Sequence, residues 1–471
     1  MGQDIHQSHF RKTDFHEFQK RLDEETRILA DMVRDNDFEQ GRKVAGYELE
    51  TWLTCKKGYP SPSNESLLAK INNDEIVSEL ALYNIEVNGP PKDLSANSLS
   101  EMEQDIQQRW DLCMRKADEL NLNMVSIGIL PTLENKHLGL AAMSPAKRYR
   151  ALNEQVLRLR EGKPIQLDLK GKDHLKLEHQ DVMLEAAATS FQIHLQMDLD
   201  KAAHYYNLSK IISAPMVAAC ANSPFLFGKE LWEESRIPLF EQAVAVGGTD
   251  YCRRVTFGVR YLEGPVFDVF EANRQRYPVL LPLVMETEPE KLKHLSLHNG
   301  TIWRWTRPII GFNEQGKATV RIEHRTVPAG PTLLDQTANM AFFLGLITEM
   351  AGQQDWIRRI PHKDSLDNFY KAAKKGIHAD INWLDGKKVN LRSLCLHDLL
   401  PKAAKGLKSL NIDSAEAEFY LGILHNRLKS GQTGANWQKK WVAKHGKAWN
   451  ELTMQYSENQ QRNKAVHTWE V

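Results

Sequence analysis

The sequence predicts an α+β fold in which helices pack against an antiparallel sheet. Segments that alternate between apolar and polar residues, as strands with one buried face do, recur along the 471-residue chain. Segments with the periodicity of amphipathic helices are intermingled with these strands. The composition, 42% apolar and 26% charged residues, is that of an ordinary globular protein.

The individual elements follow from these periodicities and from the turn residues between them. A capped apolar stripe predicts a first helix at 13–40, and the alternating run after it predicts a strand at 46–53. Further strands are predicted at 80–88, 124–130, 191–198, 301–308 and 319–326, and further helices at 97–121, 143–160, 201–220 and 332–352. Residues 362–471 have helical periodicity and carry no recognisable chemical motif.

Charge, hydropathy and cysteine content exclude several classes of protein. Basic and acidic residues both number 61, so no overall positive field favours nucleic acid or an anionic membrane. The N-terminus lacks an apolar signal region, and no apolar run is long enough to span a bilayer. The cysteines form no CxxC pair and are interpreted as reduced thiols of a cytoplasmic protein; they are Cys55, Cys113, Cys220, Cys252 and Cys395.

Glu48 and Glu50 form the first candidate site. Positions i and i+2 of a strand point to the same face, so the two carboxylates repel each other unless a cation or a basic side chain lies between them. Taken alone, the pair is more typical of a solvated strand face.

A second pair of acids, Glu79 and Glu86, occurs about thirty residues later. Glu86 lies inside an otherwise apolar run, where a buried carboxylate without a partner would be costly. A metal ion or an arginine would compensate its charge, and Asn88 would share its strand face.

Two later segments also place polar side chains on single strand faces. Gln192, His194 and Gln196 alternate with apolar residues, a row that suits metal, phosphate or substrate binding, with a solvated sheet face as an equal alternative. Glu323 and Arg325 share a face of the strand expected at 319–326. Arginine there, as in the segment 302–308, suits phosphate or carboxylate, and surface ion pairs are the alternative.

Several common catalytic signatures are missing. The sequence has no Walker A motif, GxGxxG, GxSxG or HExxH. P-loop, Rossmann, serine-hydrolase and zincin interpretations therefore fail.

The order of the motifs between residues 44 and 380 resembles the glutamate–cysteine ligase family, within the glutamine synthetase superfamily of carboxylate–amine ligases. The ExE strand comes first, followed by the Glu79–Glu86 pair and the basic segment 147–149. The QIHLQ strand, the segments 221–228, 235–236 and 303–308, the Glu323-x-Arg325 strand and the helix start at 368–376 follow in the family order.

This resemblance implies a fold and a set of metal ligands. The expected fold is a glutamine synthetase-like core with a curved antiparallel sheet, helices on its convex side and a helical C-terminal region. Glu50, Glu79 and Glu86 resemble the ligands of one Mg²⁺. Glu48 and Glu323 resemble those of a second Mg²⁺, completed by either Gln192 or His194.

The resemblance also implies the reaction and its other residues. Arg325, Arg307 and Arg236 are expected to hold the transferring phosphoryl group or the substrate carboxylate, and Gln196, Arg304 and Asn222 to contact the nucleotide. The expected cofactors are ATP and two or more Mg²⁺ ions. ATP would convert a glutamate-like acid into an acyl phosphate, from which an amine displaces phosphate, as in glutathione biosynthesis.

One residue departs from the family pattern. Pro328 stands where many relatives carry an aspartate after the Glu323-x-Arg325 strand, which leaves the amine acceptor open. The alternatives are a ligase for another acid and amine, or a homologue that binds without catalysis. A guanidino kinase on the same fold ranks below both, because those enzymes lack the ExE pattern.

The expected organisation has three parts. Residues 1–43 form an N-terminal helical segment, 44–385 the ligase core and 386–471 a helical extension. The expected partners are small molecules, without nucleic acid or membrane, and a homo-oligomer is left open.

Overall fold

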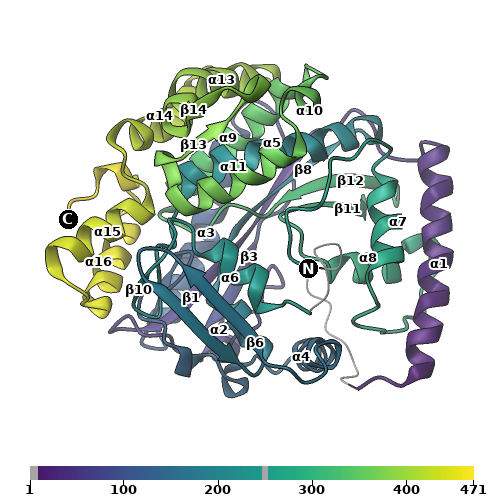
Figure 1. Ribbon diagram of the computed structural model, residues 1–471, viewed down its shortest axis with the longest axis horizontal. Coiled ribbons are helices and arrows are strands. Elements are labelled where there is room, and N and C mark those ends of the chain that lie inside the picture. The colour runs from purple at the N-terminus through teal and green to yellow at the C-terminus, as the bar shows by residue number, and fades with distance from the viewer. Residues whose placement is uncertain (1–8, 247–252) are drawn as a thin grey trace.

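An eight-stranded sheet forms the centre of the computed structural model, which describes residues 9–246 and 253–471 (Figure 1). Its strand order is β11-β12-β8-β1-β3-β2, while β4 and β5 pair with β1, and all of these pairings are antiparallel. The strands are β1 Val44–Cys55, β2 Ile76–Ser78, β3 Asn84–Asn88, β4 Lys92–Asp93, β5 Leu122–Val125, β8 Phe191–Met197, β11 Thr306–Phe312 and β12 Ala318–His324. The predicted α+β class with a curved antiparallel sheet is confirmed.

Two long apolar helices, α5 Leu199–Cys220 and α9 Leu333–Ala351, cover one face of the sheet. The ring of His324 on β12 stacks on Phe343 of α9 at 4.5 Å between centroids. The Nδ1 atom of the same histidine lies 3.0 Å from the hydroxyl oxygen of Ser209 on α5. Because side chains alternate along a strand, Glu323 and Arg325 point to the opposite face, which these helices leave uncovered.

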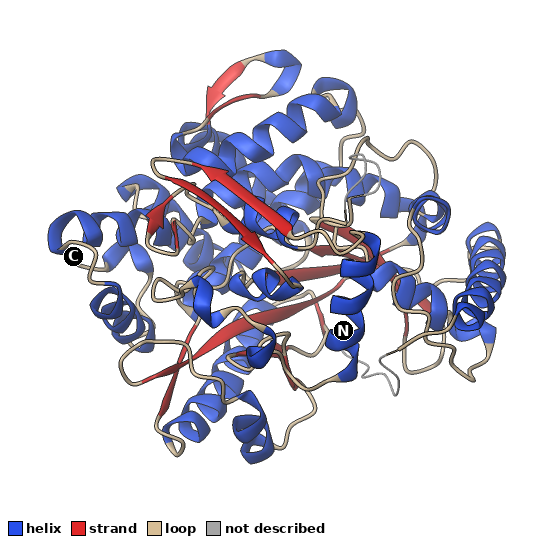
Figure 2. Cartoon of the chain, turned by 60° about the horizontal axis from the view of Figure 1, so that its bottom comes forward, coloured by secondary structure: helices blue, strands red, loops and turns tan. Residues whose placement is uncertain are grey.

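The remaining elements surround this core (Figure 2). The other α-helices are α1 Lys12–Arg34, α2 Asn64–Ile71, α3 Ser98–Asp118, α4 Lys147–Leu159, α6 Arg236–Ala243, α7 Phe267–Arg276, α8 Lys293–Gly300, α10 Trp356–Arg359, α11 His362–Lys375, α12 Leu391–Leu394, α13 Leu400–Ser409, α14 Ser414–Ser430, α15 Gly434–His445 and α16 Trp449–Gln461. Three small antiparallel ribbons pair β6 Ile165–Lys170 with β7 His174–His179, β9 Phe225–Leu226 with β10 Lys229–Glu230, and β13 Asp380–Asn382 with β14 Lys388–Asn390.

Several predicted elements differ from the structure at their ends, because tertiary contacts override local pattern. The helix expected at 13–40 ends at Arg34, and the helix expected at 143–160 begins at Lys147. The strand expected at 80–88 begins only at Asn84, since Ala81 forms an isolated bridge with Met143 instead. The strand expected at 124–130 ends at Val125, because the backbone of Ser126 is hydrogen-bonded by side chains of α16. The strand expected at 301–308 begins at residue 306, and the ribbon of β6 and β7 was not predicted.

The C-terminal helices pack closely on the core. Helices α9 and α13 approach so tightly that a Cβ atom on Gly406 would lie 1.8 Å from the carbonyl oxygen of Gly345, which only glycine avoids. Tyr456 and Gln460 of α16 both donate hydrogen bonds to the carbonyl of Ser126. The region 386–471 therefore shares one hydrophobic core with the sheet.

Two further findings concern the exclusions made from composition. No helix in the described part of the chain is long and apolar enough to cross a bilayer. The four described cysteines, Cys55, Cys113, Cys220 and Cys395, are free thiols, while Cys252 and the first eight residues lie outside the described residues.

Candidate active site

The register of the sheet gathers the predicted polar residues on its uncovered face. On the central strand β1, Glu48 lies opposite Gln192 of β8 and Glu50 lies opposite Glu86 of β3. One step along the sheet, His194 of β8 is paired with Glu323 of β12. These residues are separated by up to 275 positions in sequence, so only the strand pairing brings them together.

Glu48, His194 and Glu323 form a compact cluster with the geometry of a cation site. One ligand atom of each lies within 4.8 Å of the others. The Nε2 atom of His194 is 3.4 Å from Glu48 Oε1 and 3.9 Å from Glu323 Oε1. All three side chains are buried, and neither His194 Nε2 nor Glu48 Oε2 has a hydrogen-bond partner among the described residues. Buried polar atoms rarely lack partners, so these two indicate room for an ion.

Gln192 and His194 differ in the contacts that they make. Gln192 donates its amide to Glu50 Oε1 at 2.9 Å and accepts a hydrogen bond from Arg325, so both amide atoms are engaged. His194 accepts a hydrogen bond from Arg321 at Nδ1, and burial lowers its pKa. The neutral ring therefore carries its proton on Nε2, so a cation at Nε2 requires the Arg321 contact to change. The two glutamates provide the oxygen atoms that Mg²⁺ prefers.

Glu323 is held by two arginines. Arg307 donates from Nε and Nη2 to the two oxygens of Glu323 at 2.8 and 2.9 Å, and Arg325 adds a contact of 3.2 Å. Although burial alone would raise the pKa of Glu323, Arg307 and Arg325 hold it well below its usual range. Glu323 therefore stays ionised in the interior, which makes it a suitable ligand for a cation.

A second group of four carboxylates, from Glu50, Glu79, Glu86 and Glu185, lines an adjacent cavity of about 300 Å³. Burial, followed by neighbouring carboxylates, raises the pKa of Glu50, Glu79 and Glu185 to about 7 and that of Glu86 well above its usual value. Glu50 is fixed by the backbone N–H of Ser190 at 2.7 Å and by the amide of Gln192. Such uncompensated acids fit the binding of a cation.

The three predicted arginines take different places. Arg325 lines the cavity, and its Nε has no hydrogen-bond partner in the part of the chain that the structure describes. Arg307 is fully used by Glu323 and by the carbonyls of Asn299 and Gly300, so the structure gives it a role in positioning Glu323.

Arg236 lines a neighbouring pocket together with Arg325, Glu50 and Glu79. Its guanidinium donates to the carbonyls of Arg325 and Thr326 and to Glu234 Oε1 at 3.4, 2.5 and 3.2 Å. It therefore fixes the backbone that carries Arg325.

The three residues predicted to contact the nucleotide lie in different parts of the structure. Gln196 lines a larger cavity of about 530 Å³ beside His194 and Glu48, together with Asn313 and Arg321. This position is next to the cluster of Glu48, His194 and Glu323.

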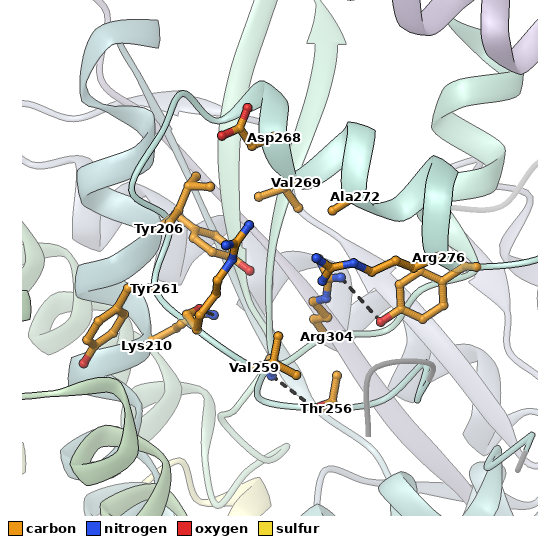
Figure 3. A pocket seen from close by; sticks show the side chains of 14 residues that line it. Tyr206, Lys210, Thr256, Val259, Tyr261, Asp268, Val269, Ala272, Arg276 and Arg304 are labelled. Atoms are coloured by element: carbon orange, nitrogen blue, oxygen red, sulfur yellow. Dashed lines mark hydrogen bonds between the residues drawn. The ribbon is translucent and has the colours of Figure 1, made fainter. Parts of the chain in front are cut away.

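The expectations for Arg304 and Asn222 are not supported by their positions. Arg304 lies beside Tyr206 and Tyr277 in a different cavity (Figure 3), because it alternates with Trp305 and so points to the helix-covered side. Asn222 is fully buried and uses its amide on the carbonyl of Ala329, the hydroxyl of Tyr456 and the amide of Gln438. Its side chain has no atom left for a ligand.

Glu185 is the site residue that the sequence-based prediction missed. It lies in the short helix η3 Val182–Ala187, surrounded in sequence by apolar residues. One of its carboxylate oxygens is buried and meets no hydrogen-bond partner within residues 9–246 and 253–471. A single acid inside an apolar run is the pattern that singled out Glu86, and the same reasoning would have found Glu185.

Comparison with known proteins identifies a family and a fold. The sequence model of glutamate–cysteine ligase family 2 (GCS2) matches residues 44–458. A glutamate–cysteine ligase from Francisella tularensis, solved in complex with AMP, superposes with a TM-score of 0.55 at 12% identity, covering 92% of this chain and 91% of that one. A bifunctional glutathione synthetase from Pasteurella multocida gives a TM-score of 0.49 at 10% identity, covering 93% and 55%. The curated proteins contain no match.

Proposed function

Since the chain belongs to glutamate–cysteine ligase family 2 and is therefore an ATP-dependent carboxylate–amine ligase, we propose that it joins the γ-carboxylate of a glutamate-like acid to an amine through an acyl phosphate. The observation that carries this proposal is the Glu48–His194–Glu323 cluster, with its two unpartnered buried atoms. It adjoins a cavity lined by four more carboxylates and by Arg325.

The proposed cofactors are Mg²⁺ and ATP. Glu48 and Glu323, with His194, would hold one Mg²⁺, and Glu50, Glu79 and Glu86 a second. Bound Mg²⁺ would neutralise the phosphate oxygens of ATP and align its γ-phosphoryl group. The carboxylate oxygens of Glu50, Glu79 and Glu86 do not lie as close together as the ligand atoms of the first cluster. We therefore place the second ion within the cavity that these three glutamates line.

The nucleotide is proposed to occupy the cavity beside Gln196 and Arg321. This cavity reaches Glu48 and His194, so phosphates that enter from it meet the first cation cluster. The AMP complex of the structurally similar Francisella ligase agrees with a nucleotide site on this fold.

Arg325 is proposed to stabilise the phosphoryl group in transfer. It lines the cavity that contains Glu50 and Glu79, and Arg236 and Glu323 fix its position. A guanidinium with several donors suits the oxygens of a phosphoryl group that carries charge in the transition state.

The two substrates are proposed to meet in the cavity of about 300 Å³. Arg148 lines it and provides positive charge for a substrate carboxylate. Glu185 faces the same cavity from η3, and its buried free oxygen suits the ammonium group of an amino acid. Protein of this kind would act in the cytoplasm on small molecules, and cysteine is one candidate amine, as in glutathione biosynthesis.

A screen for ADP release tests the proposal. Purified protein is incubated with ATP, Mg²⁺ and glutamate, together with a panel of amines that includes cysteine, and products are identified by mass. We expect ADP release to need Mg²⁺, the acid and one of the amines. If no combination of acid and amine stimulates ADP release, the proposed reaction is wrong.

A further inference from the structure

A second polar cavity lies on the opposite side of the segment that carries Trp303 and Trp305. Its walls come from α5, from α7 and from the loop 256–262 (Figure 3). Arg304 enters it, whereas its neighbours Trp303 and Trp305 line the candidate active-site cavities. The residues that line it include Tyr206, Lys210, Arg260, Asp268, Arg276 and Arg304.

The charges around this cavity are unbalanced. Lys210 is only 2% exposed, and its Nζ contacts the carbonyl oxygen of Arg260 at 2.9 Å and lies 4.7 Å from the centroid of the Tyr206 ring. Arg304 contacts the hydroxyl of Tyr277 at 3.4 Å. Among the described residues, Lys210, Arg304 and Arg276 form no ion pair with a carboxylate, and Asp268 is the one carboxylate in the lining.

The electrostatics agree with an uncompensated positive site. Burial and the nearby Arg304 lower the pKa of Lys210, whereas Tyr206 raises it, and the net shift is downward. Burial would raise the pKa of Tyr206, but Lys210 and Arg304 lower it overall. Buried cations without an anionic partner are costly, so an anion that enters the cavity would be stabilised by both basic side chains.

We propose that this cavity binds a small oxyanion, with Lys210, Arg304 and Arg276 as its cationic contacts. In Figure 3 the side chains of Arg304 and Arg276 approach each other from two elements, with Lys210 and Tyr206 across the cavity. The free volume of about 50 Å³ suits a carboxylate, sulfate or phosphate group. Guanidinium groups match the paired oxygens of such anions, and the Tyr206 hydroxyl can donate a further hydrogen bond.

This site is distinct from the proposed catalytic site. Thr306 and Ser209, whose hydroxyl oxygens lie 3.2 Å apart, mark the helix-covered side of the sheet on which Arg304 lies. Arg307 and Glu323, by contrast, pair on the uncovered face. Ligands of the two sites therefore approach the segment 303–307 from opposite sides.

Titration of the full chain with inorganic sulfate by calorimetry, together with thermal unfolding at equal ionic strength in chloride, tests the proposal. Lys210→Met removes the buried charge at similar volume, and Lys201→Met, an exposed lysine on the same helix, is the matched control. We expect wild type and Lys201→Met to bind sulfate and to melt at higher temperature with it. Lys210→Met is expected to bind at least about tenfold more weakly and to lose the shift.

Two further variants complete the design. Arg276→Met changes a partly exposed side chain, so it reports on the site even if the buried substitution prevents folding, and we expect it also to weaken binding. Arg325→Met is expected to keep the sulfate response, because Arg325 belongs to the other cavity. Equal sulfate binding by wild type, Lys210→Met and Arg276→Met would overturn the proposal, as would loss of the response in Arg325→Met alone.

Discussion

Replacement of Glu50 by glutamine tests whether the carboxylates of the cavity are arranged for a cation. Glu50 lies opposite Glu86 in the sheet and is fixed by Ser190 and Gln192. The substitution removes a negative charge at nearly constant volume. If the cluster binds a cation, the substitution should stabilise the metal-free protein, and it should weaken Mg²⁺ binding and lower turnover.

The size of the effect follows from the pKa of Glu50. Burial and the charge of Glu86 raise that pKa from 4.5 to about 7, so the folded state holds its proton more tightly than the unfolded chain. Above pH 7 the ionised side chain costs the metal-free fold up to about 3 kcal/mol. Glutamine keeps one acceptor oxygen, so the substitution loses one of the two hydrogen bonds from Ser190 and Gln192 and leaves that donor facing an NH₂ group, which together offset about 2 kcal/mol. At pH 8 the variant should be more stable by about 1 kcal/mol, and its melting temperature should rise by about 1–3 °C.

The pH dependence gives the sign of the effect independently. At pH 5 the wild-type carboxyl is protonated in the folded chain and only partly ionised in the unfolded chain, so the variant gains less than about 1 kcal/mol, which its weaker hydrogen bonding outweighs. Its melting temperature should then equal or fall below that of wild type. Stability of the metal-free wild type should decrease as pH rises through 7.

Thermal unfolding at pH 8 and pH 5, with and without Mg²⁺, is the assay, together with ADP release. The matched control is Glu65→Gln, which neutralises an exposed carboxylate on α2. We expect Glu50→Gln to lose the Mg²⁺-dependent rise in melting temperature and at least about 100-fold in turnover. A variant that melts lower without Mg²⁺ at pH 8, yet keeps the Mg²⁺ response and turnover, would refute the reasoning.

Three further predictions follow from the site. Calorimetry between pH 6 and 7 should show Mg²⁺ affinity rising about tenfold per pH unit for each proton displaced, because Glu50 and Glu79 have a pKa of about 7 and bind the ion when ionised; a flat profile would contradict this. Arg325→Lys should lower kcat by about 100-fold or more in the ADP assay, because lysine cannot replace the forked donors, and an unchanged kcat would exclude a phosphoryl contact. Asn222→Ala should lower the free energy of unfolding by about 2–4 kcal/mol in denaturant titrations, because it leaves the buried partners of Asn222 without hydrogen bonds. The KM for ATP should stay constant. A raised KM without loss of stability would instead indicate that Asn222 contacts the nucleotide.

The sequence predicted the acidic strand face well because strand periodicity is local. Alternation alone placed Glu48 with Glu50, and Glu323 with Arg325, on shared faces. Apolar surroundings marked Glu86 as a buried acid before any contact was known. The family order of these motifs indicated that they belong to one site.

Other assignments failed because they depend on which layer covers a strand. Arg304 and Arg307 stand three positions apart in one motif, but they lie on opposite sides of the sheet. Asn222 belongs to a family motif, but α15 and α16 bury it and use its amide, through Gln438 and Tyr456. Periodicity tells which residues share a face, and it does not tell what packs on that face.

The sequence by itself determined the fold class, the ligase family and the pairs of acids, because local periodicity and the order of motifs along the chain are properties of the sequence. Only the tertiary structure decided that Glu48, His194 and Glu323 converge within 4.8 Å, since three strands distant in sequence must pair in one register. The structure likewise decided that Glu185 joins the carboxylates of Glu50 and Glu79 and that Arg304 faces a separate basic cavity. Burial and neighbouring charge, which shift the pKa values and leave atoms unpartnered, arise only when these segments meet.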